Sequence, residues 1–187
     1  MHRYLFSVTW MIWALYWWIQ SRRVKANVWR ESLSSRLLHI IPLLVAGLLL
    51  GSPSISVAGL NERFAPLASS LYWLGFALTL CGIFFSVLAR KHLGRNWSAT
   101  VTIKHDHELV QSGPYAYVRH PIYTGLLLAF IGSAIALGEW RGIVAVVLVT
   151  VALWRKLRVE ERGMQQRFGE KYLEYSRKVA ALIPFVL

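Results

Sequence analysis

The chain has 187 residues, of which 56% are hydrophobic, and it carries a formal net charge of +12. A nucleic-acid-binding domain would be basic but far less apolar, so the composition argues against a nucleic-acid partner. Apolar membrane spans joined by basic loops on one side combine both properties. The composition therefore predicts an integral membrane protein, and the length suits a single domain over residues 1–187.

Five apolar runs follow one another along the chain and predict five membrane-spanning helices. They are Tyr4–Gln20, Leu37–Gly51, Ala68–Ala89, Ile122–Gly138 and Gly142–Trp154. Only the third clearly reaches the roughly 20 residues that a helix perpendicular to the bilayer needs. Flanking Trp, Tyr, Arg and Lys side chains can extend the others to the interface. No cleavage signal follows the first run, so we expect it to be retained as a span.

The basic residues predict how these spans are oriented. With the N-terminus outside, 18 lysine and arginine residues fall on the inner side, and the outer side has only Arg3, Arg63 and Arg141. The positive-inside rule therefore predicts an all-α protein with five transmembrane helices, the N-terminus out and the C-terminus in. Residues 1–89 would form three spans. Residues 90–187 would add two spans, a cytoplasmic cofactor-binding loop and a cytoplasmic C-terminal helix.

Two features inside the apolar runs have ordinary structural interpretations. Trp10, Trp13 and Trp17 recur at three- and four-residue steps on one helical face, which lipid contact or helix packing explains. Cys81, the single cysteine, can form no intramolecular disulfide, and we expect it to be a small buried hydrophobe.

The polar stretch SGPYAYVRHPIYTG, residues 112–125, precedes the fourth run. Ser-Gly-Pro at its start is a turn signal. Pro121 suits the first turn of the following helix, so His120 would lie at or near its N-cap. The free N–H groups of that helix start, together with the charge of Arg119, would form an anion site at the membrane surface. The alternative is that these side chains only anchor the interface and cap the helix.

The segment after the fifth run carries a pair of adjacent acids, Glu160 and Glu161. Lys156 precedes Glu160 by four residues, a spacing that also suits a simple surface ion pair. A carboxylate facing the basic loop could instead bind the ammonium or ribose hydroxyls of a ligand. The fifth span is expected to continue as a helix here, with Phe168, Tyr172 and Tyr175 on one aromatic face.

Two other kinds of site are not supported. The sequence has no glycine-rich nucleotide loop of the Rossmann or Walker type. His105 and His107 are two residues apart without a third ligand at helical spacing, so we expect no metal site.

The stretches HELVQSGPYAYVRHPIYTG and KLRVEERGMQQRFGEKYLEYSRKVAALIPF together resemble the isoprenylcysteine carboxyl methyltransferase family, which is related to the membrane phospholipid N-methyltransferases. The resemblance covers about Leu93–Phe185. It implies an integral-membrane methyltransferase that uses S-adenosyl-L-methionine, with an acceptor that enters from the bilayer. The implied partners are a lipophilic substrate and membrane lipids. The implied cofactor-binding residues are His107, Glu108, Leu109, Val110, Tyr115, His120, Pro121, Ile122, Tyr123 and Glu160.

The candidate catalytic residues are Arg119, Lys156 and Glu161. The family usually has arginine at the position of Lys156, where it contacts the acceptor. Lysine cannot make a bidentate fork to a carboxylate, although the neighbouring Arg155 or Arg158 could substitute.

The type of acceptor decides whether the site needs a base. A carboxylate or thiolate acceptor needs none. An amine must lose a proton, which His107, His120 or Glu161 could take.

Two other functions stay open at this point. One is an NADPH-dependent membrane reductase of the sterol-reductase type, which shares a similar C-terminal architecture and a His-Pro-x-Tyr-like element. The other is a non-catalytic membrane scaffold. The Gly-Pro-Tyr and Glu-Glu elements favour the methyltransferase, and the short loops suggest the cytoplasmic membrane of a prokaryote, with the active site facing the cytoplasm.

Overall fold

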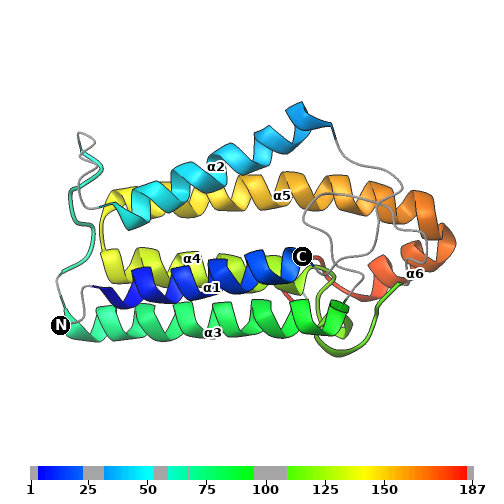
Figure 1. Cartoon of the computed structure of the whole chain (residues 1–187), viewed down its shortest axis with the longest axis horizontal. Coiled ribbons are helices and arrows are strands. Elements are labelled where there is room, and N and C mark those ends of the chain that lie inside the picture. Colours follow the sequence, from blue (N-terminus) through cyan, green and yellow to red (C-terminus); the bar gives the residue numbers. More distant parts are fainter. Residues whose placement is uncertain (1–3, 23–31, 53–58, 67, 95–108, 185–187) are drawn as a thin grey trace.

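The structure, a computed structural model, describes residues 4–22, 32–52, 59–66, 68–94 and 109–184. Within these residues the chain is helical, with isolated β-bridges as its only β pairing. The long helices are α1 (Leu5–Ser21), α2 (Leu33–Gly51), α3 (Ser69–Leu93), α4 (Pro121–Leu137) and α5 (Trp140–Phe168). The short 3-10 helix η3 (Gly113–Ala116) and helix α6 (Glu170–Lys178) lie near one end of the bundle (Figure 1).

Each of the five apolar runs corresponds to one long helix, so the prediction that these runs are helical is confirmed. That all five helices cross the membrane stays a prediction. By length and apolar composition, α2 and α3 could each cross a membrane, and α4 is a shorter apolar helix. Successive long helices alternate in direction (Figure 1). One end of the bundle therefore gathers the C-terminal ends of α1, α3 and α5 and the N-terminal ends of α2 and α4.

Helices α3 and α4 pack together through pairs of glycines. A Cβ atom added to Gly125 would lie 2.5 Å from the carbonyl oxygen of Gly82, and one added to Gly132 would lie 2.5 Å from that of Gly75. Between the two pairs, the Thr79 hydroxyl donates to the Gly75 carbonyl at 2.9 Å. Small residues let two helices approach closely, and here they fix the position of α4, whose first turn carries the candidate site.

We expect Gly132→Ala to destabilise the protein strongly. The new methyl group would collide with backbone atoms of α3, so the two helices must move apart. This lowers the free energy of unfolding by at least about 2 kcal/mol. The thermal unfolding midpoint in detergent measures the loss. Gly47→Ala is the matched control, because nothing lies within 4 Å of a Cβ at that position of α2. Equal midpoints for the two variants would contradict the close packing of α3 on α4.

The tryptophan stripe of α1 is used for helix packing. The indole N–H of Trp10 donates to the Ser133 hydroxyl of α4 at 3.1 Å, and that of Trp13 donates to the Ser86 hydroxyl of α3 at 3.1 Å. The ring of Trp17 stacks on that of Trp13 with 4.8 Å between centroids. The stripe therefore holds α1 against the α3–α4 pair.

Cys81 is exposed on α3, so the prediction of a buried cysteine is wrong. The face of α3 that packs inward includes Thr79, Gly82 and Ser86, which recur at helical spacing. Cys81 directly precedes Gly82 and therefore lies about 100° around the helix from it, away from that face.

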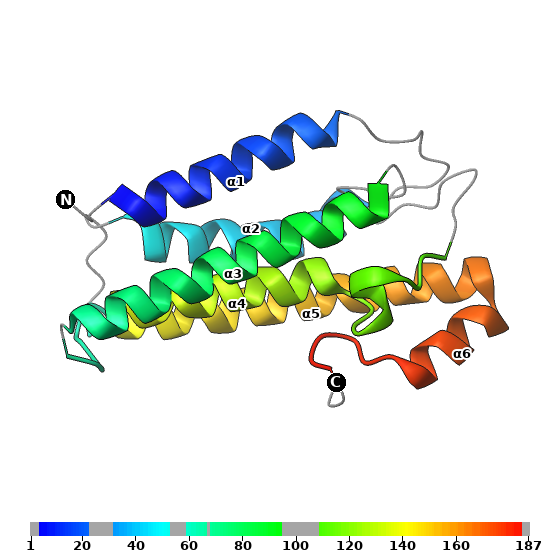
Figure 2. The ribbon, with the colours of Figure 1, turned by 90° about the horizontal axis from the view of Figure 1, so that it is seen from below.

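Helix α5 continues well beyond its apolar run and ends at Phe168, because Gly169 takes a positive φ of 55°. Helix α6 then folds back toward the bundle (Figure 2). The prediction that Phe168 shares one helical face with Tyr172 and Tyr175 is wrong, since this break separates them. After α6, residues 179–184, called here the C-terminal segment, run beside the chain that enters α4.

Candidate active site

The sequence before α4 folds as its turn and cap signals predict. Gly113 takes a φ of 59° and begins η3, with Pro114 in its first turn. His120 is the N-cap of α4 and Pro121 is its first residue, where proline loses no helical hydrogen bond. The backbone N–H groups of Arg119 and His120 donate to the carbonyls of residues 180 and 181, at 2.8 and 3.0 Å. The C-terminal segment thus fixes the entry of α4.

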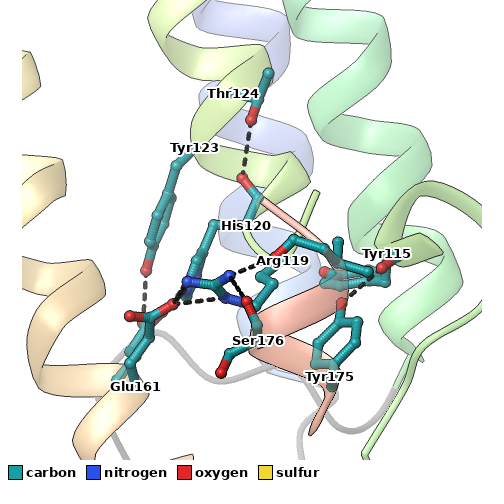
Figure 3. A network of polar contacts seen from close by, with 10 residues as sticks. Tyr115, Arg119, His120, Tyr123, Thr124, Glu161, Tyr175 and Ser176 are labelled. Atoms are coloured by element: carbon teal, nitrogen blue, oxygen red, sulfur yellow. Dashed lines mark hydrogen bonds and ion pairs between the residues drawn. The ribbon is translucent and has the colours of Figure 1, made fainter. Parts of the chain in front are cut away.

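Arg119 joins three parts of the fold (Figure 3). Its Nε donates to Glu161 of α5 at 2.8 Å, and its Nη2 lies 2.6 Å from the same carboxylate oxygen. Its Nη1 donates to the carbonyls of Ser176 at 3.0 Å and of Val179. The side chain is only 12% exposed. The guanidinium therefore binds groups of the protein itself, and the catalytic role expected for Arg119 stays a prediction.

His120 lies between the two acids of α5. Its Nδ1 is 3.5 Å from Glu160, and its Nε2 is 3.4 Å from Glu161. Nε2 is buried, and the Glu161 carboxylate is close enough to it for strong electrostatic attraction. The Tyr123 hydroxyl donates to Glu160 at 2.5 Å, and the Tyr123 ring is parallel to the imidazole within 3°. The predicted residues Glu160, Glu161, His120 and Tyr123 are therefore in one cluster.

Charges in this cluster shift the pKa values of its members. Burial disfavours the charged form of His120, but hydrogen bonds and the negative charges of Glu160 and Glu161 outweigh it and raise the pKa of the imidazole. Burial also opposes the ionisation of Glu160 and Glu161. Even so, the contact with His120 lowers the pKa of Glu160. The contacts with His120 and Arg119 lower the pKa of Glu161 to about 2. The cluster thus favours an imidazolium between two carboxylates.

These shifts predict how stability depends on pH. The raised pKa of His120 contributes stability that is complete below its ordinary value of 6.5 and is lost as pH rises through the raised value. The lowered pKa of Glu161 contributes stability that is present above 4.5 and is lost as pH falls toward about 2. We expect the unfolding midpoint in detergent to fall on the alkaline side. His120→Gln should flatten that fall, and an unchanged profile in the variant would contradict the assignment.

The remaining predicted cofactor residues are only partly described by the structure. Tyr115 is buried in η3, and its carbonyl accepts from the Tyr175 hydroxyl at 2.6 Å. Pro121 and Ile122 are buried in the first turn of α4. Leu109 and Val110 are half-buried at the start of the described segment. The predicted residues His107 and Glu108 lie outside the described residues.

The three neighbouring cations of α5 point in different directions. The Nζ of Lys156 lies 5.4 Å from the centre of the Tyr123 ring, and its charge helps to lower the pKa of Glu160. Arg155 donates to the carbonyl and hydroxyl of Ser35 in α2, at 2.8 and 2.6 Å. Arg158 is exposed, 5.7 Å from the Trp154 ring. Of these three, Lys156 is the cation that faces the cluster.

Sequence reasoning did not find several groups that hold the site together. The Thr124 hydroxyl donates to the Leu182 carbonyl at 2.6 Å, and the carbonyls of Ser176 and Val179 accept from Arg119. Thr124 lies one helical turn after His120, a spacing that could have suggested it. Backbone carbonyls carry no signal in the sequence, because every residue has one.

The part of the chain that the structure describes contains no group of three or more His, Cys, Asp or Glu that could hold a metal ion.

A comparison with protein families finds one family whose matched region includes this site. The model of the phospholipid methyltransferase family matches residues 70–171, which include α3 from its second residue and the whole of α4 and α5, with both acids. The chain belongs to the phospholipid methyltransferase family. The family match thus contains the cluster of His120, Tyr123, Glu160 and Glu161, and the C-terminal segment lies beyond it.

The names of curated relatives confirm the resemblance to isoprenylcysteine carboxyl methyltransferases. The protein-S-isoprenylcysteine O-methyltransferase of Schizosaccharomyces pombe is 35% identical over 120 residues, 60% of this chain and 48% of the relative. The probable enzyme of that name from Oryza sativa subsp. japonica is 32% identical over 125 residues, 62% of this chain and 64% of the relative. The chain spans about half the length of the first of these relatives.

A solved structure of a eukaryotic intramembrane Ras methyltransferase, isoprenylcysteine carboxyl methyltransferase, is similar to this chain with a TM-score of 0.46 and 25% sequence identity. The similarity covers 80% of this chain and 63% of the other.

Proposed function

We propose that this protein is an integral-membrane methyltransferase that moves a methyl group from S-adenosyl-L-methionine to a lipophilic acceptor at the cytoplasmic edge of the membrane. The observation that carries the proposal is the cluster of His120, Tyr123, Glu160 and Glu161 within the family-matched region. The names of the curated relatives support the reaction type.

The residues of the cluster suit the proposed cofactor. S-adenosyl-L-methionine carries a methylsulfonium, which supplies the reactive methyl group, together with an ammonium and ribose hydroxyls. Glu160 is 24% exposed and can accept hydrogen bonds from such groups.

The proposed membrane arrangement has five spans, with the N-terminus outside and the C-terminus inside. The alternating direction of the helices supports this arrangement. The basic residues that are predicted to lie inside and the cluster of His120, Glu160 and Glu161 are at the same end of the helical bundle. A water-soluble cofactor and a lipophilic acceptor can both reach a site at that edge. The cytoplasmic membrane of a prokaryote remains the proposed location.

The pKa shifts of Glu161 and His120 favour an anionic acceptor, which is a carboxylate or a thiolate. An amine acceptor needs a base, but the two carboxylates raise the pKa of His120, which favours its protonated form, and the contacts with His120 and Arg119 lower the pKa of Glu161 to about 2. The shift at Glu161 weakens it as a proton acceptor, and the shift at His120 leaves less of the neutral imidazole that could accept a proton. An anionic acceptor attacks with its own electron pair and releases no proton, and Lys156 would attract its charge.

A methylation assay with a prenylated cysteine and with phosphatidylethanolamine distinguishes the two acceptor classes.

Calorimetric binding of S-adenosylhomocysteine and of NADPH to the detergent-purified protein tests the proposed function. We expect S-adenosylhomocysteine to bind and NADPH not to bind. Binding of NADPH alone would replace the proposal with a reductase of the sterol-reductase type. If a protein with intact helical circular dichroism binds neither compound, the function would be that of a non-catalytic scaffold.

A further inference from the structure

His92 lies in the last turn of α3 and contacts the turn that carries Tyr115. Its Nε2 is 2.9 Å from the Ser112 hydroxyl, at hydrogen-bond distance. Its ring lies 6.3 Å from the Tyr115 ring, centre to centre, and the planes differ by 25°. One side chain at the end of α3 thus contacts both ends of the short stretch from Ser112 to Tyr115.

The backbone of this turn fits closely against the imidazole. A Cβ atom added to Gly113 would lie 2.7 Å from Cε1 of His92, and the φ of 59° at Gly113 already favours glycine. The imidazole therefore occupies the space that a side chain would otherwise take. This contact fixes the turn relative to α3 more tightly than the hydrogen bond alone.

Tyr115 is held from two directions as a result. The His92 ring faces its side chain, and the hydroxyl of Tyr175 in α6 donates to its carbonyl at 2.6 Å. Tyr115 is 7% exposed, and burial followed by the negative charge of Glu160 raises the pKa of its hydroxyl. The position of this neutral hydroxyl relative to the acid cluster thus depends on α3 through His92.

We propose that His92 is a positioning residue for the cofactor site, acting through the Ser112–Tyr115 turn. This inference rests on the proposed function, in which Tyr115 contacts the cofactor. Loss of the imidazole frees Ser112 and leaves a gap beside Gly113, so the turn gains freedom that the cofactor must remove on binding. The cost then falls on cofactor binding rather than on the chemical step.

The test compares cofactor binding with turnover in the full-length protein. We expect His92→Ala to raise the Kd of S-adenosylhomocysteine and the KM for the methyl donor by about tenfold, the size of one lost hydrogen bond plus a ring contact. The kcat at saturating donor should change by less than about twofold, because no group at the reacting atoms is altered. His92→Gln, whose amide can still reach the Ser112 hydroxyl, should recover most of the affinity.

Two further variants make the test specific. Ser112→Ala should resemble His92→Ala in direction, and the double variant should be little worse than His92→Ala, because both remove the same bond. Lys91→Ala is the matched control, since Lys91 is the exposed neighbour of His92 on the same helical turn. Its Kd should stay at the wild-type value.

Hydrogen exchange of the amides of residue 113 and residues 115–118 in ligand-free protein gives a readout that needs no cofactor. We expect faster exchange in His92→Ala and recovery in His92→Gln. If the wild type binds S-adenosylhomocysteine and His92→Ala binds it equally well, the positioning role is overturned and the proposed function stands. If the wild type does not bind it, the proposed function fails and this inference fails with it.

Discussion

Replacing Glu160 by glutamine should weaken the binding of S-adenosylhomocysteine by about a hundredfold, or about 2.7 kcal/mol. Glutamine keeps the size of the side chain and removes its charge. The Tyr123 hydroxyl then donates to a neutral oxygen instead of a carboxylate, and the imidazolium of His120 loses one of its two counter-charges. Hydrogen bonds to charged groups are stronger than neutral ones, so cofactor groups that bind this carboxylate lose the most.

Calorimetry on the detergent-purified variant measures this loss. Glu170→Gln is the matched control, because Glu170 is 65% exposed on α6 and pairs only loosely with Arg177, at 3.4 Å. The control should bind as tightly as the wild type. Wild-type affinity in Glu160→Gln, with an intact fold, would remove Glu160 from the cofactor site.

Replacing Arg119 by alanine should lower the unfolding free energy by about 3–5 kcal/mol, the usual cost of breaking a buried ion pair from one side. The variant leaves Glu161 without its guanidinium partner and removes the donor shared by the carbonyls of Ser176 and Val179. Arg119→Lys should recover only part of the loss, since one ammonium cannot reach all three partners in the way a planar guanidinium does.

The unfolding midpoint in detergent reports the stability change, and turnover reports its effect on the site. We expect turnover to fall more than cofactor affinity, because Glu161 and the entry of α4 shift together. Arg177→Ala, which removes an arginine that is 70% exposed, should change the unfolding free energy by less than about 0.5 kcal/mol. Similar stability in Arg119→Ala and Arg177→Ala would mean that Arg119 does not join α5 to the C-terminal segment.

The helices could be predicted from the sequence because their signals are local. Apolar runs mark them, and Pro121 predicts that His120 lies at or near the N-cap of α4, since proline is favoured at the first helical position. The adjacent acids Glu160 and Glu161 also stood out, because acids are rare next to an apolar run. Each of these inferences needs only neighbouring residues.

The partners of Arg119 could not be predicted in the same way. Its carboxylate partner Glu161 is 42 residues away, and its carbonyl partners belong to residues whose side chains give no hint of the contact. Arg155 and Lys156 illustrate a related limit. They are adjacent in the sequence, yet one helical step sends Arg155 toward Ser35 of α2 and Lys156 toward Tyr123. Which neighbour faces the site depends on helix rotation, which the packing of α2 and α5 decides.

The contact between the C-terminal segment and the start of α4 has a consequence for biosynthesis. The N–H groups of Arg119 and His120 need carbonyls that are translated about 60 residues later, as chain order dictates. All five long helices can therefore be made and can pack before these groups receive their partners. Completion of the site is a separate and later event than assembly of the helical bundle, and a ribosome-bound chain that ends at α6 would have the bundle without the finished site.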